Sequence, residues 1–325
     1  MKKLFVCAAA AIVALASCSK TEYINNQEPK GIAFKAVTGS ITKAEATALS
    51  ATHSTMGVFA FVHNTENTPY FTNGKFEPNT GTNTWEGGYF WPLQSSLDFM
   101  VYAPYGDDDD NLEPTPTLGN SVTPTLKVPV KTIYNVNNNA YSVSTTGSQD
   151  ATHSNQTDYL YGKSYFNDGY TYNSASIPIE LKHALSKITF NIDCSNIVIH
   201  SVKLSDFHTA DYYTVTYGQE TSVVWNSTAS GKNLLVTDLD HENTSATFLI
   251  VPSVQYDILI NYTLDGAETD LDAKIVLSAN NDKWLTGYHY TYNIKIDPKG
   301  IQLVPLVSPW TPVTDSPNGT PVPQI

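Results

Sequence analysis

The chain contains no arginine: its 18 basic residues are all lysines, against 31 acidic residues. Arginine is the side chain that clamps carboxylates and phosphates through two parallel hydrogen bonds, so that kind of clamp is excluded. The formal net charge of −13 also disfavours nucleic acid, because an acidic surface repels a phosphate backbone. We therefore expect no nucleic-acid partner.

Cysteine is nearly as scarce, with three in the whole sequence. Cys7 lies in the first apolar run and Cys18 lies three residues after its end, which leaves Cys194 without a partner for a disulfide or a cysteine metal cluster. The sequence also lacks a Gly-x-Ser-x-Gly elbow, a His-Glu-x-x-His pair and a phosphate-binding glycine loop. A facing pair of glycosidase carboxylates stays open as an alternative, although no motif marks one. We expect no cofactor, no metal and no enzymatic activity.

Long apolar runs are missing except for one near the start. The run Leu4–Leu15 is about twelve residues long, too short for a hydrocarbon core that needs about 20. Its charged start and the Leu15-Ala16-Ser17-Cys18 sequence after it predict a secretory signal over residues 1–17. Bacterial lipoprotein processing requires a cysteine at this place, so we expect Cys18 to carry an outer-membrane lipid anchor. A plain secretory signal with a chance cysteine is the alternative.

Aromatic residues are plentiful, making up 11% of the chain with 20 tyrosines, while charged residues make up 15%. Aromatic and β-branched residues suit the pleated surface of a sheet. The segments Lys187–Cys194 and Tyr288–Ile296 alternate between apolar and polar, and Met56–His63 is apolar almost throughout, as in a strand buried on both faces. Many short strands without interleaved helices predict an all-β protein of β-sandwiches.

Two dipeptides and one proline give local predictions. Asn73-Gly74 and Asp265-Gly266 are hairpin turn signals between apolar segments. Leu126–Val130 reads as an edge strand, because Pro129 has no N–H to donate to a neighbouring strand. The length of the chain suggests about two domains. We place a signal peptide at 1–17, a tether at 18–30, an N-terminal domain at 31–175 and a C-terminal domain at 176–325.

Nine segments carry a resemblance to a known family. The most specific are His183-Ala-Leu-Ser-Lys187 and Trp284–Ile294. The others are Gly31–Phe34, Thr42–Ala44, Gly57–Phe61, Tyr89–Pro92, Leu97–Pro104, Thr157–Gly162 and Val307–Trp310. They occur in the family's order along the chain, and together they resemble the fimbrillin family, the type V pilins of gut and oral anaerobes. The resemblance implies two tandem transthyretin-like Greek-key β-sandwich domains, lipoprotein export, polymerisation into a fimbria and cell adhesion.

The resemblance also implies a mechanism of assembly. An outer protease cuts after a basic residue and removes the leading segment with its first strand, which here carries Ile32, Phe34 and Ala36. Lys43 is the candidate cleavage site, because a cut at Lys30 or Lys35 would leave part of that strand. Without arginine, the protease has to be specific for lysine. A loop lysine without a role is the alternative for Lys43.

The vacated groove would be filled by a strand from the C-terminal end of another subunit, a case of β-augmentation. The candidate donor strand carries Ile301, Leu303 and Val307. Pro305 lies inside it and removes one ladder donor, so the segment suits an edge better than a central position. The alternative is that Ile301–Val307 is the last strand of its own domain.

The expected partners are other fimbrial subunits, of the same or a related kind, the outer-membrane lipid, and a host or bacterial surface receptor. The expected location is the cell surface and its fimbriae. A different class of function stays open: a cell-surface glycan-binding lipoprotein of a nutrient-uptake complex, with tyrosines as the glycan platform. At strand periodicity, however, tyrosines more often pack against neighbouring strands.

Overall fold

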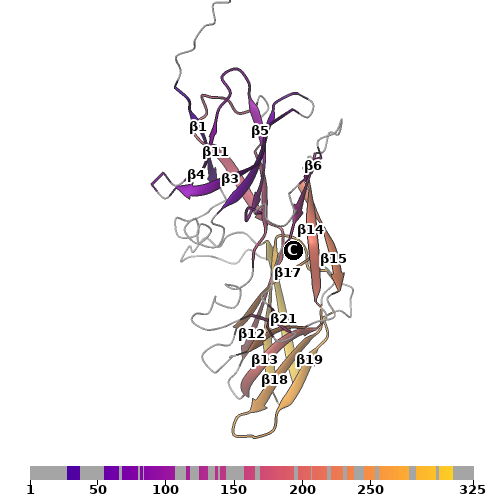
Figure 1. Ribbon diagram of the computed structural model, residues 1–325. Helices are drawn as coiled ribbons and strands as arrows, with labels where there is room; N and C mark the ends of the chain where they lie inside the picture. The colour runs from indigo at the N-terminus through magenta and orange to yellow at the C-terminus, as the bar shows by residue number, and fades with distance from the viewer. Residues whose placement is uncertain are drawn as a thin grey trace, which may run out of the picture.

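The computed structural model describes residues 28–36, 55–65, 68–79, 81–82, 84–106, 115–117, 124–130, 136–137, 140–143, 157–164, 169–193, 197–205, 207–217, 221–229, 233–237, 245–252, 256–277, 283–297 and 300–309. Every regular element in these ranges is a β-strand, which confirms the all-β prediction (Figure 1). None of the described residues forms a helix long and apolar enough to span a bilayer. Cys18, Lys43 and Cys194 lie outside the described residues.

Seven strands close into a barrel in the order β1-β11-β10-β5-β2-β3-β4. Figure 1 shows this barrel in the upper part of the molecule. Its strands, in chain order, are β1 (Gly31–Ala36), β2 (Met56–Val62), β3 (Pro69–Asn79), β4 (Thr84–Phe90), β5 (Leu97–Ala103), β10 (Leu160–Ser164) and β11 (Ile177–His183).

Three open sheets form the lower lobe, in the orders β17-β12-β20-β21, β19-β18-β13-β16-β9-β8 and β15-β14-β7-β6. The first contains β12 (Ser186–Asp193), β17 (Ser245–Ile250), β20 (Tyr288–Asp297) and β21 (Gly300–Pro309). The second contains β8 (Val136–Asn137), β9 (Ala140–Val143), β13 (Ile197–Ser205), β16 (Asn233–Thr237), β18 (Ile258–Leu264) and β19 (Leu271–Ile275). The third contains β6 (Thr115–Thr117), β7 (Thr125–Pro129), β14 (His208–Tyr217) and β15 (Thr221–Ala229).

Strand pairing crosses the domain boundary expected between residues 175 and 176. Strand β11 begins after it but belongs to the barrel, where it pairs with β1 and β10. Strands β7 and β9 precede it but pair with β14 and β16 of the lower lobe. Each lobe therefore contains strands from both halves of the chain, and that boundary does not separate the sheets.

Strand β2 is buried on both faces, as its apolar run predicts. Val58 and Ala60 point into the barrel core, whereas Phe59 and Phe61 belong to the apolar cluster of the lower lobe. The barrel wall is thus shared between two cores, and apolar packing continues from one lobe into the other. This burial on both sides favours a stiff connection between the lobes.

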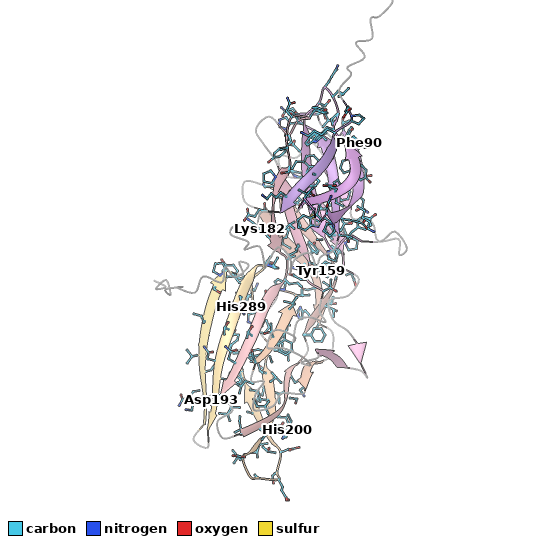
Figure 2. All side chains as sticks on the ribbon, turned by 90° about the vertical axis from the view of Figure 1, so that its left-hand side faces the viewer. Phe90, Tyr159, Lys182, Asp193, His200 and His289 are labelled. Atoms are coloured by element: carbon cyan, nitrogen blue, oxygen red, sulfur yellow. The ribbon has the colours of Figure 1, made fainter. Side chains whose placement is uncertain are left out.

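Hydrogen bonds reinforce the contact between the lobes. The Tyr213 hydroxyl on β14 donates to the carbonyl oxygen of Leu160 on β10, at 3.0 Å. The Trp225 indole nitrogen on β15 donates to the Ala184 carbonyl oxygen just after β11, at 2.8 Å. Tyr159, labelled between the lobes in Figure 2, packs its ring edge-on against Tyr213 with centroids 6.0 Å apart.

The two hairpin predictions had different outcomes. Asp265-Gly266 does turn between the antiparallel strands β18 and β19, with Gly266 at φ 77°, so this prediction is confirmed. The prediction for Asn73-Gly74 is wrong, because both residues lie inside β3. Asn73 has φ 47° and the register between β2 and β3 shifts here, which makes the site a bulge. Its amide oxygen accepts a hydrogen bond from the Tyr102 hydroxyl at 2.7 Å, so tertiary contact stabilises the bulge.

The edge prediction for Leu126–Val130 is also wrong. Strand β7 lies between β6 and β14 and pairs with both. The pairing with β6 covers Thr125–Lys127 and stops before Pro129, which pairs with Tyr212 of β14. The proline therefore lies beyond the doubly paired part of the strand, where its missing N–H is tolerated.

The alternating segments form strands as expected. In β12, Ile188, Phe190 and Ile192 are buried, and in β20 the same holds for Tyr290, Tyr292, Ile294 and Ile296. Tyr288, at the start of β20, is 37% exposed and departs from the expected face. The side chain of Trp284, just before β20, is 1% exposed, and its indole nitrogen donates to the Tyr292 hydroxyl at 2.9 Å.

Candidate assembly site at the first and last strands

Strand β1 closes the barrel by joining two strands of opposite direction. It pairs in parallel with β11, from Phe34 opposite Ile177 to Ala36 opposite Ile179. It pairs antiparallel with β4, where Gly31 lies opposite Phe90 and Phe34 opposite Trp85. Without β1, both β11 and β4 would present an unpaired edge.

The inward side chains of β1 fill the barrel core. Ile32 is 1% exposed and Phe34 is fully buried. The Phe34 ring lies edge-on to both Phe76 and Phe99, with centroids 5.0 Å apart in each case. The structure therefore places two of the three predicted first-strand residues in the core. Ala36 is the last residue of β1, and its side chain lies outside the described part.

Lys30, directly before β1, binds the segment that leads into β11. Its ammonium nitrogen donates to the carbonyl oxygens of Tyr172, at 3.0 Å, and Ser174, at 2.6 Å, and lies 5.7 Å from the centre of the Tyr172 ring. The Tyr172 hydroxyl donates to the Glu28 carbonyl oxygen at 2.8 Å, and the Trp91 N–H donates to the Lys30 carbonyl oxygen at 3.0 Å. We call residues 28–30 the latch, because their contacts fix the start of β1 to both sides of its slot.

Sequence reasoning gave Lys30 no structural role and treated it only as a competing cleavage site. The sequence shows only that Pro-Lys-Gly-Ile occurs at both residues 29–32 and residues 298–301, and this match does not reveal the contacts of Lys30. Lys35 lies within β1 and its side chain is exposed, so a cut there would divide the strand. Neither lysine offers the clean removal of β1 that a cut after Lys43 would give.

Strand β21 is the last strand of its own sheet. It pairs with β20 in an unbroken register from Tyr288 opposite Pro309 to Asp297 opposite Gly300, and among the described strands it has no second neighbour. Leu303 and Val307 pack against the core of the lower lobe. Ile301 lies opposite Ile296, and its side chain is outside the described part.

The outer face of β21 is unusually apolar for an edge. Val304 is 61% exposed and Leu306 is 57% exposed. Pro305 lies between them, opposite Tyr292. An exposed apolar edge strand is a template for pairing with another chain, and proline is among the features that restrain such pairing.

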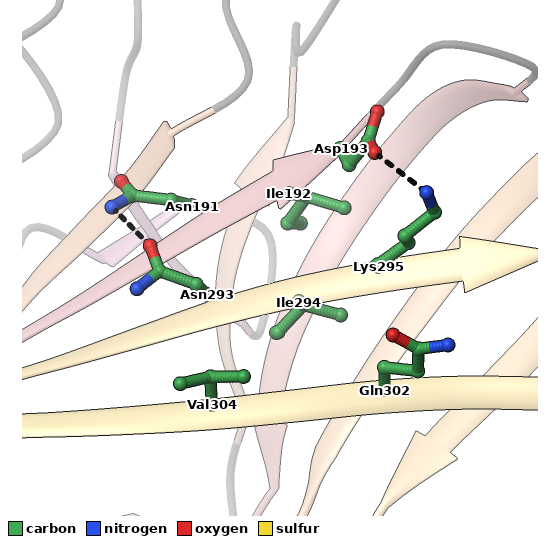
Figure 3. Close-up of a pocket in the computed structure, with 8 residues that line it drawn as sticks. All are labelled: Asn191, Ile192, Asp193, Asn293, Ile294, Lys295, Gln302 and Val304. Atoms are coloured by element: carbon green, nitrogen blue, oxygen red, sulfur yellow. Dashed lines mark hydrogen bonds and ion pairs between the residues drawn. The ribbon is translucent and has the colours of Figure 1, made fainter.

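An open depression of about 370 Å³ lies where β12, β20 and β21 run side by side (Figure 3). Its polar side chains already pair across the strands: the Asn191 amide donates to Asn293 at 3.0 Å, and Lys295 lies 3.7 Å from Asp193. Gln302 and Val304 of β21 complete the rim. Because the depression is open and these polar groups bond to one another, we assign it no ligand.

Two partly buried histidine–aspartate pairs hold strand ends together. His63 and Asp98 are 2.8 Å apart, and His183 and Asp158 are 2.6 Å apart. Burial raises the pKa of Asp98, while the hydrogen bond from His63 acts in the opposite direction. Within the described residues, no group of three or more histidine, cysteine or acidic side chains is placed to hold a metal ion.

Comparison with known proteins completes these observations. A sequence-family model described as fimbrillin-like matches residues 42–310. The fold resembles a fimbrial protein from Bacteroides vulgatus, with 13% identity, a TM-score of 0.55, and 87% of this chain and 100% of that chain covered. It also resembles a candidate cell adhesion protein from Bacteroides ovatus, with 13% identity, a TM-score of 0.53, and 89% and 100% covered. No curated protein shows significant sequence similarity.

Proposed function

Because this chain belongs to the fimbrillin-like family, we propose that it is a subunit of a bacterial surface fimbria that polymerises by exchange of its first strand. Family membership places the protein among fimbrial and cell-adhesion proteins, at the cell surface. The exchange mechanism, the order of events and the residues involved are the proposal. It assigns the chain a structural role in adhesion and no enzymatic one.

The observation that carries the proposal is the position of β1. A single short strand joins β11 to β4, and it is the first strand of the described chain. Its removal would leave two strand edges with unpaired backbone groups and empty the core volumes of Ile32 and Phe34. An added strand would pair with these backbone groups and fill the core volumes, if it carries two apolar side chains two positions apart, as Ile32 and Phe34 are.

We propose that a lysine-specific protease cuts after Lys43 and so releases β1. The donor is β21 of a second copy or of a related subunit, with Ile301, Leu303 and Val307 as its apolar residues. An edge strand leaves its sheet by breaking one ladder, whereas a central strand would break two. Because each subunit gives one strand and receives another at a different surface, the contact is heterologous and produces a filament.

The uncut precursor is held to the outer membrane by lipid on Cys18, and several acyl chains make such an anchor firm. A cut after Lys43 removes this anchor together with β1. Release from the membrane and readiness for assembly are then produced by the same event.

The test is to treat the purified precursor with a lysine-specific protease and follow it by denaturing gels and electron microscopy. A cut after Lys43 should be followed by filaments, and the Lys43→Gln variant should remain uncut there and monomeric. A cut product that stays monomeric contradicts the proposal. If that monomer bound glycans strongly, a glycan-binding lipoprotein would be the better description.

A further inference from the structure

Nearly the same sequence leads into the strand that leaves and into the strand proposed to replace it. Residues 28–34 read Glu-Pro-Lys-Gly-Ile-Ala-Phe and residues 297–303 read Asp-Pro-Lys-Gly-Ile-Gln-Leu. Four residues in a row are identical, an acidic residue precedes them in both segments, and a large apolar residue follows two positions later. The pair Lys-Gly occurs nowhere else in the chain.

We propose that this match fixes the register of strand exchange, so that Lys299 of a second copy takes the place of Lys30. Ile301 and Leu303 then take the places of Ile32 and Phe34. The inference rests on the proposed function, since it specifies how the donor lies in the slot of β1. It also identifies the partner as a second copy of this chain.

The latch explains why a lysine is needed at this position. When residues 28–36 leave, the carbonyl oxygens of Tyr172 and Ser174 lose a charged donor that lay 3.0 and 2.6 Å away. Hydrogen bonds to a charged group are stronger than those between neutral groups, so the loss leaves two carbonyl oxygens without their strongest partner. A donor strand with lysine directly before its Gly-Ile restores both contacts.

The alternation of side chains agrees with this register. Ile32 and Phe34 point into the barrel core, whereas the Lys35 side chain is exposed. In the donor, Leu303 packs inward and Val304 is exposed in its own sheet, which is the same alternation. A slip by one residue would turn every inward side chain outward.

Slips by two residues fail for different reasons. If Ile301 occupied the Phe34 position, Lys299 would fall at Ile32, which is 1% exposed, and its charge would be buried in the core. If Leu303 occupied the Ile32 position, Pro305 would fall at Phe34, a residue paired with both β11 and β4. Proline cannot satisfy a doubly paired position.

The proposed register places Pro305 where it is tolerated. It falls at Ala36, the last residue of β1. The pairing of β1 with β4 ends at Phe34, so position 36 has only β11 beside it. A proline at the end of a strand, next to one neighbour, is an accepted position.

Disulfide trapping tests the register. Ala33 lies opposite Glu86 of β4, so Gln302 of the donor should lie there in the filament. The chain without its signal sequence and Cys18 is given Cys194→Ser, a site-specific protease sequence in place of residues 38–43, and Gln302→Cys with Glu86→Cys. It folds with β1 in place and is then cut once. We expect disulfide-linked multimers after the cut and none before it.

Matched variants separate the possible results. Thr84→Cys or Phe90→Cys, each with Gln302→Cys, reports a slip by two residues in either direction and should give no multimers. Lys299→Met should slow assembly at least tenfold, because it removes the charged donor of both carbonyl contacts, while Lys283→Met, at an exposed lysine, should not. The register is contradicted if the filaments crosslink at residue 84 or 90, or if the Lys299→Met variant assembles at an unchanged rate. Strand exchange itself would still hold in both cases. The absence of filaments overturns both.

Discussion

The ammonium nitrogen of Lys30 lies 2.6 Å from the carbonyl oxygen of Ser174, although 144 positions separate the two residues in the chain. This contact joins the start of the first barrel strand to the segment that leads into β11, beside which that strand lies in parallel. Release of β1 therefore requires more than breaking its two ladders, because the latch must open as well.

Substitution of Lys30 by methionine should loosen β1 without unfolding the rest of the barrel. The variant keeps the apolar stem of the side chain and removes the ammonium group that binds Tyr172 and Ser174. We expect amide hydrogen exchange in residues 31–36 to rise at least tenfold, because two charge-assisted hydrogen bonds are lost. Exchange measured by mass spectrometry on the uncut chain reports this directly.

Lys35→Met is the matched control for that measurement. Lys35 lies within β1, five residues after Lys30, and its side chain is exposed. Its substitution should leave exchange in β1 unchanged. Equal exchange in the two variants would mean that Lys30 does not hold the strand.

The Trp284→Ala substitution should reduce the free energy of unfolding by about 3–5 kcal/mol. The indole is 1% exposed, donates to the Tyr292 hydroxyl and packs edge-on against Tyr256 with centroids 5.3 Å apart. Leu285→Ala, at a neighbouring side chain that is 49% exposed, should change little. Chemical denaturation of both variants makes the comparison, and similar midpoints would contradict the burial of this ring.

Gly57→Ala should destabilise the barrel by about 1–3 kcal/mol, the usual effect of overpacking. Gly57 lies opposite Tyr102 in the pairing of β2 with β5, and an added Cβ would collide with the Tyr102 ring. The ring cannot move freely, because its hydroxyl is bonded to Asn73. At Gly106 an added Cβ meets only the Tyr102 hydroxyl oxygen, at 3.7 Å, so Gly106→Ala should be tolerated. Thermal denaturation distinguishes the two, and equal stability would refute the steric account.

Stability should fall at alkaline pH partly through Tyr161. Burial raises the pKa of its hydroxyl to about 12, and the negative charge of Glu180 adds to the effect. In the unfolded chain a tyrosine ionises near pH 10, so the contribution is complete below about pH 10 and is lost as the pH rises toward about 12. Tyr161→Phe should remove about 2–3 kcal/mol of that pH dependence. Urea denaturation between these pH values shows it, and parallel pH profiles for the two proteins would be inconsistent with the raised pKa.

Local patterns in the sequence were sufficient to predict the strands that turn one face to the core and the other to solvent. In β12 and β20 the apolar residues recur at every second position because one face meets the core, and that period is visible in the residues themselves. The apolar run of β2 likewise predicted burial on both faces. Such predictions need only the residues of one strand.

Pairing between distant strands could not be predicted in this way. Nothing local to β11 shows that it lies beside β1, or that β7 has neighbours on both sides. Asn73 and Gly74 carry a turn signal, but the Tyr102 hydroxyl and continued pairing with β2 favour a bulge instead. The first strand of the candidate site was expected from family resemblance, whereas the latch was visible only once Lys30 could be seen beside Ser174.

The most direct test of strand exchange is the N-terminus of the protein in filaments taken from the cell surface. Mass spectrometry should find a chain that starts at Ala44, with residues 31–36 absent from the filament. A chain that starts at lipidated Cys18 and keeps β1 inside an assembled filament would contradict the account.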